Sequence, residues 1–199
     1  MTTEVEHGYA KGRAKRREIM DEAMALFGEV GYRGASLREI AARCGISHPG
    51  LLHHFPTKES LLLAVLAHRD EVDGESLAMD GTTGTDTLRR LVDLVFLNAT
   101  RRGIVELFAV LSAEATSPDH PAHSFFVERY RNAVQAAELT YAQVRDEGRL
   151  RPGIDPGASA RQLIALMDGL QVQWLLDGRE TDMAGVVHAH INAQLTVPL

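Results

Sequence analysis

Residues 36–55 read SLREIAARCGISHPGLLHHF, a stretch with two helix-start signals around one helix-stop signal. Ser36 stands three residues before Glu39, the spacing at which a serine hydroxyl and a glutamate carboxylate cap the start of a helix reciprocally. Gly45 follows where a helix most easily ends in a left-handed turn. Ser47 can then cap another helix that ends near Phe55. The stretch therefore predicts two short helices joined by a tight turn.

Apolar residues at three- and four-residue spacing predict a longer helix on either side of this pair. The preceding helix is expected to stop at Gly31, and its apolar face consists of Ile19, Ala23, Leu26, Phe27 and Val30. Thr57 caps the following helix, KESLLLAVLAHRDEV, which runs toward Met79. The short pair is expected to pack through Ile40, Ala41, Ile46, Leu51 and Phe55. Two short helices packed on a longer one form a helix-turn-helix, whose second helix fits the major groove of DNA.

Helical periodicity continues through the rest of the chain, and strand signals are nearly absent. The stretch DGTTGTD at 80–86 is expected to separate a DNA-binding domain at 1–56, with a connecting helix at 57–79, from a second domain at 80–199. Five further helices are expected at about 85–101, 103–116, 122–147, 157–176 and 181–195. The sequence thus predicts an all-α fold, with an N-terminal three-helix helix-turn-helix domain and a helical C-terminal domain.

Charge is distributed unevenly along the chain. The net charge of all 199 residues is −6, yet residues 1–56 carry eight Lys or Arg against seven Asp or Glu. Five of these eight bases lie in the segment Lys11–Arg17, which contains no acid. A basic strip on an acidic protein attracts phosphate locally, although a solvated terminal arm explains the charge equally well.

The chain carries no signal for export or membrane insertion. No apolar run approaches the roughly 18–20 residues that a membrane-spanning helix needs, and the charged N-terminus is not followed by an apolar segment. Cys44 is the single cysteine, so no intrachain disulfide can form. A reducing cytoplasm is therefore the expected compartment.

The run AMALFGEVGYRGASLREIAARCGISHPGLLHHFPTKESLLLAVL resembles the N-terminal domain of the TetR family of bacterial transcriptional repressors. Ordered matches cover about residues 15–66, namely A-x-x-L-F-x-E-x-G-Y, S-L-R-E-I-A, G-I-S, H-H-F and T-K-E-S-L-L. The resemblance implies an all-α homodimer with a DNA-binding domain and a ligand-binding and dimerisation domain. It is weak beyond about residue 80, so no residue role is carried over there.

The resemblance also implies which side chains meet DNA. Arg38 is expected to reach a base edge or a phosphate, and the first turn of the recognition helix is expected to face bases. That turn consists of Ser47, His48, Pro49 and Gly50, while His53, His54 and Lys58 align with phosphate contacts and Lys15 and Arg16 belong to the basic arm. The family usually has a tyrosine that binds phosphate at position 52. Leu52 cannot make that bond, so His53 or the arm would carry more of the anchoring.

Three histidines within seven positions also raise the alternatives of a metal site and a pH switch. His48 and His53 are five residues apart, about 140° around a helix, so their rings do not converge as metal ligands must. No cysteine or acid lies at a matching offset, and no metal site is expected. Nothing in the sequence supports a pH switch.

The C-terminal half suggests a ligand cavity and a dimer interface. Phe96, Phe108, Val110, Met167 and Trp174 are expected to line an apolar cavity between helices. Apolar stripes on the last two helices are expected to form a two-fold four-helix bundle through Leu163, Met167, Leu170, Trp174, Val187 and Ile191. A buried helical hairpin within one chain would explain the same stripes.

The expected function is that of a dimeric transcriptional regulator. It would bind a palindromic double-stranded operator and leave it when a small apolar or amphipathic effector binds. No nucleotide loop, nucleophile elbow, metal motif or cofactor motif is present, so neither an enzyme nor a cofactor is expected. Two alternatives stay open. One is an enzyme that pairs Asp168 with a histidine, and the other is a dimeric small-molecule-binding protein that has lost specific DNA binding.

Overall fold

A computed structural model describes residues 2–77 and 82–199, with side chains for 11–70 and 82–199. Within these residues the chain forms nine α-helices, and its one β-type contact is an isolated antiparallel bridge between Leu150 and Leu195. The helices are α1 (Thr2–Gly34), α2 (Leu37–Arg43), α3 (His48–His54), α4 (Lys58–Leu77), α5 (Thr85–Asn98), α6 (Arg102–Glu114), α7 (His123–Asp146), α8 (Pro156–Leu176) and α9 (Met183–Gln194). The predicted all-α fold class is confirmed.

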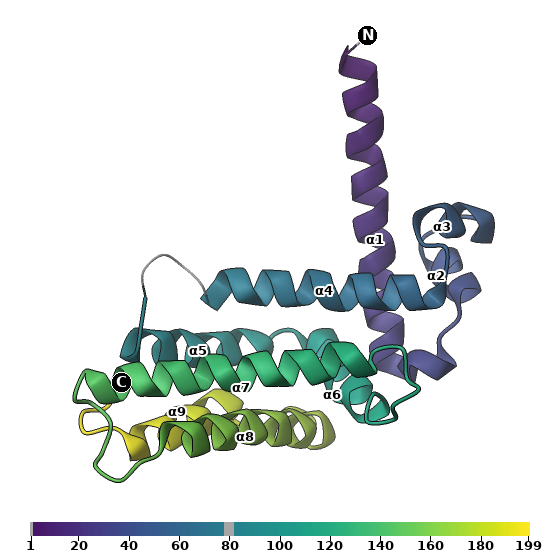
Figure 1. The fold of residues 1–199 in the computed structure, drawn as a ribbon. Helices are drawn as coiled ribbons and strands as arrows, with labels where there is room; N and C mark the ends of the chain where they lie inside the picture. Colours follow the sequence, from purple (N-terminus) through teal and green to yellow (C-terminus); the bar gives the residue numbers. More distant parts are fainter. Residues whose placement is uncertain (1, 78–81) are drawn as a thin grey trace.

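The helix-turn-helix stands at one end of the molecule. Figure 1 shows α1 projecting beyond the rest of the chain, with α2 and α3 beside it. From there α4 runs across the top of the bundle formed by α5 to α9. None of the helices in the described ranges combines the length and the apolar character that a bilayer crossing needs.

One hydrophobic core joins the helix-turn-helix to the C-terminal half. Phe27 of α1, Ile40 of α2 and Leu51 of α3 are fully buried in it, as the sequence predicted. Leu107 and Leu111 of α6 belong to the same core. The helix-turn-helix is therefore packed directly on α6, and a boundary near residue 80 divides the sequence without dividing this core.

Two glycines shape the junction between α1 and α6. Gly31 has φ +73°, a left-handed conformation that interrupts the helical geometry inside α1, at the position predicted as the helix stop. A Cβ at Gly28 would lie 3.2 Å from the backbone nitrogen of Leu107 and 3.3 Å from the carbonyl oxygen of Gly103. The two helices therefore meet backbone to backbone at Gly28.

A second core fills the C-terminal bundle. Its largest contributors are Tyr141 of α7, Leu163 and Trp174 of α8, and Val187 and Ile191 of α9, all of them buried within the single chain. Leu88 and Val95 of α5 belong to the same core. The apolar stripes of α8 and α9 thus cover α5 and α7 of their own protomer.

Side-chain caps fix the short helices. Ser36 Oγ accepts from the backbone nitrogen of Glu39 at 3.2 Å, while the Glu39 carboxylate accepts from Arg43 instead of closing the predicted reciprocal cap. Ser47 Oγ accepts from the backbone nitrogen of Gly50 at 3.2 Å, which starts α3 as predicted. The expected end of α4 near Met79 and the first part of the 80–86 boundary lie outside the described residues.

Candidate DNA-binding surface and ligand cavity

The recognition helix α3 turns one face inward and one outward. Leu51 and Phe55, four residues apart, are buried in the first core. Ser47, Pro49 and His53 are exposed on the other side. A helix of only seven residues is thus held by its apolar face while its polar face stays accessible.

The residues predicted to contact DNA remain accessible to different degrees. Arg38, near the start of α2, is exposed, whereas His48, Gly50 and His54 are half-buried. Leu52, which replaces the usual tyrosine, is also half-buried. The structure thus leaves the first turn of α3 and the start of α2 open to a partner, and their contacts with DNA stay predictions.

Arg16 reaches from α1 to the end of the recognition helix. Its Nη1 donates to the carbonyl oxygen of His54 at 2.7 Å, and its guanidinium carbon lies 4.0 Å from the centre of the Phe55 ring. A cation at a helix C-terminus interacts favourably with the carbonyl groups that end there. Arg16, predicted as a DNA contact of the basic arm, is therefore also a brace for α3.

Two other predicted DNA contacts are engaged within the chain. Lys58 Nζ donates to the carbonyl oxygens of Tyr32 at 2.7 Å and Ala35 at 2.8 Å, so it ties the start of α4 to the α1–α2 connection. Burial lowers the pKa of this ammonium group. Lys15 Nζ donates to the carbonyl oxygen of Cys44 at 3.4 Å and pairs with Glu18 at 2.6 Å. These contacts give both lysines a structural role that their sequence context did not indicate.

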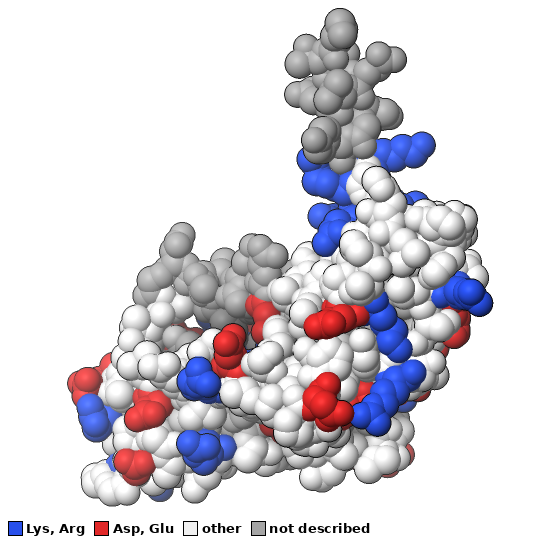
Figure 2. All heavy atoms as spheres, turned by 45° about the vertical axis from the view of Figure 1, so that its right-hand side comes forward, with Lys and Arg blue, Asp and Glu red and all other residues white. Residues whose placement is uncertain are grey.

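The most accessible bases lie on the projecting part of α1. Lys11, Arg13 and Arg17 are exposed there. Figure 2 shows blue side chains gathered on this part of α1, whereas red and blue side chains are mixed over the body below. Arg43 is different, because Glu29 holds its guanidinium with contacts of 3.1 and 2.8 Å. The positive surface available to phosphate is thus concentrated beside α3.

The two histidines at the end of α3 pack against each other. The rings of His53 and His54 meet edge to face with centroids 5.7 Å apart. Burial, and then the neighbouring His53, Arg16 and Lys15, lowers the pKa of His54, which favours its neutral form. No group of three or more His, Cys, Asp or Glu side chains suited to a metal ion occurs among the side chains that the structure describes.

Cys44 is buried in the first core, at the turn of the helix-turn-helix. Burial, with the nearby Glu18 and Glu22, raises the pKa of its thiol. A protonated, buried thiol is a poor nucleophile, so Cys44 acts as a packing residue.

A cavity of about 400 Å³ lies between α5, α6, α7 and α8. Phe108 and Met167 line it, as predicted, together with Ile104, Val105 and Ile164. The other predicted lining residues are elsewhere: Phe96 is 68% exposed on α5, Trp174 is 2% exposed in the second core, and Val110 is not among the lining residues. Helical periodicity identified apolar positions without showing whether they face the core, solvent or a cavity.

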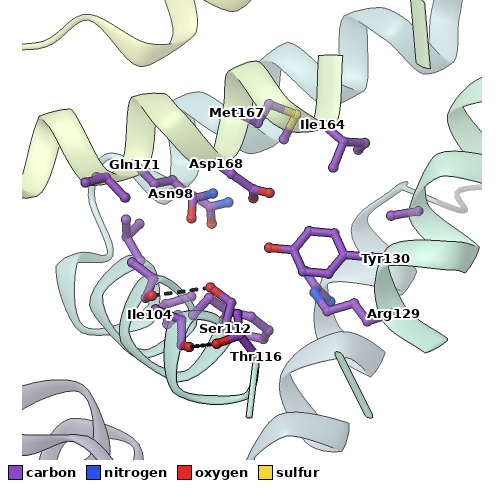
Figure 3. A pocket seen from close by; sticks show the side chains of 16 residues that line it. Asn98, Ile104, Ser112, Thr116, Arg129, Tyr130, Ile164, Met167, Asp168 and Gln171 are labelled. Atoms are coloured by element: carbon purple, nitrogen blue, oxygen red, sulfur yellow. Dashed lines mark hydrogen bonds between the residues drawn. The ribbon is translucent and has the colours of Figure 1, made fainter. Parts of the chain in front are cut away.

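Polar groups enter the cavity from α7 and α8. Figure 3 shows the Tyr130 hydroxyl and the Asp168 carboxylate directed into the same open space. Burial raises the pKa of Asp168, against the opposing influences of the Tyr130 hydroxyl and of Arg129. The hydroxyl groups of Ser112 and Thr116 bind carbonyl oxygens of their own helix segment instead.

Arg129 lines the same cavity and connects it to α4. Its guanidinium forms an ion pair with Asp70 of α4 and lies 4.4 Å above the Phe108 ring. Sequence reasoning missed this pair, because Asp70 and Arg129 lie on helices far apart along the chain. The cavity wall and the helix that leads to the helix-turn-helix therefore share one ion pair.

A second hollow, more open, lies between α7 and α8 on the far side of Asp168. It shares Tyr130, Ile164 and Asp168 with the first cavity, and its outer wall includes Glu138 and Arg161. Asp168 and Tyr130 thus stand between an inner cavity and an outer groove.

Most of the residues predicted for the dimer interface face the core of their own protomer. Leu163, Leu170, Trp174, Val187 and Ile191 are buried there, and the half-buried Met167 lines the cavity, so their part in an interface stays a prediction. The outward faces of α8 and α9 carry other apolar side chains. Val172 is 47% exposed, Leu176 82% and Val186 41%.

Both halves of the chain match known families. Residues 19–65 match the family described as bacterial regulatory proteins, tetR family, and residues 84–196 match the family described as BetI-type transcriptional repressor, C-terminal. The HTH-type transcriptional repressor KstR2 of Rhodococcus jostii (strain RHA1) is 28% identical over 127 residues, which cover 64% of this chain and 55% of that protein. The chain therefore spans about half the length of this relative.

Solved structures show the same arrangement of helices. AibR, solved in complex with isovaleryl coenzyme A and operator DNA, is 28% identical with a TM-score of 0.71, and the match covers 88% of this chain and 97% of AibR. A TetR-family regulator from Agrobacterium tumefaciens has a TM-score of 0.79 at 18% identity, over 93% of this chain and all of that one. Sequence and fold agree along almost the whole chain, and the protein belongs to the TetR family of bacterial regulatory proteins.

Proposed function

We propose that the protein is a transcriptional repressor that binds operator DNA and is released when a small molecule occupies the cavity between α5, α6, α7 and α8. The observation that carries this proposal is the recognition helix α3, which is capped by Ser47, braced by Arg16 and exposed along its polar face. KstR2 is named a repressor, and AibR has been solved with both a ligand and operator DNA, which supports both halves of the proposal.

Each part of the surface has a separate role in DNA recognition. Arg38 and the first turn of α3 read base edges, because a bidentate arginine or an exposed first helical turn can follow the hydrogen-bond pattern of the major groove. Lys11, Arg13 and Arg17 attract phosphate from the projecting part of α1. Chromosomal DNA as the partner places the protein in the bacterial cytoplasm.

A homodimer would join two such surfaces. The outward faces of α8 and α9 carry exposed Val172, Leu176 and Val186, and the exposed small residues Ala165 and Gly169 permit close helix approach. Two copies related by a two-fold axis bury these faces as a four-helix bundle. The same axis relates the two α3 helices, so the operator is an approximate palindrome.

Arg129 would pass the presence of a ligand to the DNA-binding domain. It lines the cavity and pairs with Asp70 of α4, and α4 begins at Lys58, which holds the carbonyl groups of Tyr32 and Ala35. A ligand that moves Arg129 therefore alters how α4 is held. The ligand then releases DNA only to the extent that it binds one position of α4 more tightly than the other.

The test is fluorescence anisotropy with labelled DNA from the region upstream of the gene. We expect a specific complex, and Arg38→Ala should weaken it by about 1–3 kcal/mol, roughly 5- to 150-fold, through lost base contacts. The control is Arg89→Ala, which removes an exposed arginine from α5. Equal affinity of both variants, or no specific complex with the unmodified protein, would refute the proposal.

A further inference from the structure

We propose that the effector is a compact amphiphile with a positive charge, an amine or a quaternary ammonium group that binds beside Asp168 while its apolar part contacts Phe108, Ile164 and Met167. This inference rests on the proposed ligand-responsive function and names the chemical class of ligand for the same cavity.

Asp168 is the one carboxylate among the residues that line the inner cavity. The neutral phenol of Tyr130 and the guanidinium of Arg129 are the polar groups near it, and burial raises its pKa despite both of them. A carboxylate removed from water is costly unless a cation or several donors face it. A ligand that brings a cation to Asp168 supplies the missing partner.

Arg129 does not offer the same opportunity to an anion. Its charge is already paired with Asp70, and its guanidinium is stacked on Phe108. Arg69, which donates to the side-chain oxygen of Asn98 at 3.2 Å, approaches from α4 and is not a lining residue. An anionic ligand would compete with Asp70 for Arg129 and would share a small cavity with Asp168. Charge thus favours a cation over an anion.

The size and access of the site fit a compact ligand. The inner cavity of about 400 Å³ is near the lower end of small-molecule sites, and most of its lining is apolar. Asp168 also lines the outer groove between α7 and α8, beside Tyr130, so a cation can reach it from outside. Figure 3 shows Ile164 and Met167 beside Asp168, where an apolar group attached to that cation would lie.

The test uses three probes of one size and different charge, namely 2-phenylethylamine, 2-phenylethanol and phenylacetate. Calorimetric titration of the DNA-free protein at pH 7 should give an affinity for the amine at least about tenfold above that for the alcohol, with phenylacetate weakest. Asp168→Asn should reduce the preference for the amine to within about twofold. The matched control is Glu138→Gln, which alters an acid of the outer groove alone and should leave the preference unchanged.

Equal binding of the three probes, including no binding, overturns the proposal, and so does a preference for the amine that survives in Asp168→Asn. A second readout needs no ligand. Asp168→Asn should melt at the same or a higher temperature than the parent, because the variant removes a buried charge without a cationic partner. A lower melting temperature would show that Asp168 serves the fold, against the proposal.

Operator release is measured separately, by anisotropy of the DNA complex with added 2-phenylethylamine. Release that depends on Asp168 supports both the site and the function. Binding that depends on Asp168 while the DNA complex stays intact supports the site and refutes the ligand response of the proposed function.

Discussion

His120 lies where the helix-turn-helix meets the end of α6, and its side chain is 1% exposed. Its Nδ1 accepts from the backbone nitrogen of Ala122 at 3.2 Å, and its ring meets Tyr32 edge to face with centroids 5.1 Å apart. Glu114 Oε2 accepts from the backbone nitrogen of Tyr32 at 2.8 Å and lies 3.6 Å from His120 Nε2. The acceptor role of Nδ1 requires the neutral ring, so protonation would break the hydrogen bond from Ala122 in the connection that holds the ring against Tyr32.

The free energy of unfolding should therefore depend on pH through His120. Burial lowers its pKa below the ordinary value of 6.5, against the opposing attraction of Glu114. As pH falls below about 6.5, the unfolded state binds the proton first, so the folded protein loses stability. Above about pH 6.5, neutral His120 makes its full contribution to the free energy of unfolding. Urea unfolding at several pH values between 5 and 7.5 should show this decline.

His120→Asn should make the decline smaller, because asparagine can still accept from Ala122 but does not titrate. His188→Asn removes an exposed histidine of α9 and should leave the decline as in the parent. The assignment to His120 fails if both variants follow the parent curve.

At the scale of single elements, α3 depends on residues outside itself. It has only seven residues, too few to be stable alone, and it is held by Leu51, Phe55 and the guanidinium of Arg16. The hydrogen bond from Arg16 joins residues 38 positions apart in the sequence and is accepted by the carbonyl oxygen of His54, the last residue of the helix. Arg16 thus determines how firmly the recognition surface is presented.

Arg16→Gln should lower specific operator affinity by about 1–2 kcal/mol, roughly 5- to 30-fold, because it loses a charged hydrogen bond to α3. Arg17→Gln removes an exposed neighbour and should weaken specific and non-specific complexes alike, with a salt slope smaller by about one. Anisotropy at several salt concentrations separates the two effects. If both variants change only the salt slope, Arg16 is a phosphate contact and not a brace.

The helices themselves could be predicted because their signals are local. Ser36 and Ser47 cap α2 and α3 as their spacing indicated, and Gly31 interrupts α1 at the expected position. The braces could not be predicted, because Arg16 and Lys58 contact carbonyl groups that any residue provides. Such contacts leave no pattern of residue types in the sequence.

In the whole molecule, the sequence could not show which way the apolar stripes of α8 and α9 face, for a related reason. A stripe of Leu163, Trp174, Val187 and Ile191 is apolar whether it faces a partner or the protomer's own helices. Periodicity detects the stripe. Only the packing of α5 and α7 against it shows that the stripe faces the protomer's own helices. The ligand cavity is similar, since Phe96 and Phe108 are both aromatic but only Phe108 lines it.

Disruption of the outward α8–α9 face should separate the protomers. Leu176→Glu places a charge on this face, and sedimentation analysis should show a shift from twice the chain mass to the single-chain mass. Operator affinity should fall strongly, because one α3 helix reads only half of a palindrome. Leu139→Glu is the control, since Leu139 is 61% exposed on α7. A Leu176→Glu protein that stays dimeric would place the interface elsewhere.

The ion pair between Arg129 and Asp70 has a further consequence for how the regulated gene responds to ligand in the cell. Any free-energy coupling that it carries between cavity and DNA is reciprocal, so DNA must change ligand affinity by the same factor by which ligand changes DNA affinity. Protein bound at its operator would then respond only at higher ligand concentrations than free protein. The number of DNA sites relative to protein copies would thereby help to set the concentration at which the regulated gene is switched on.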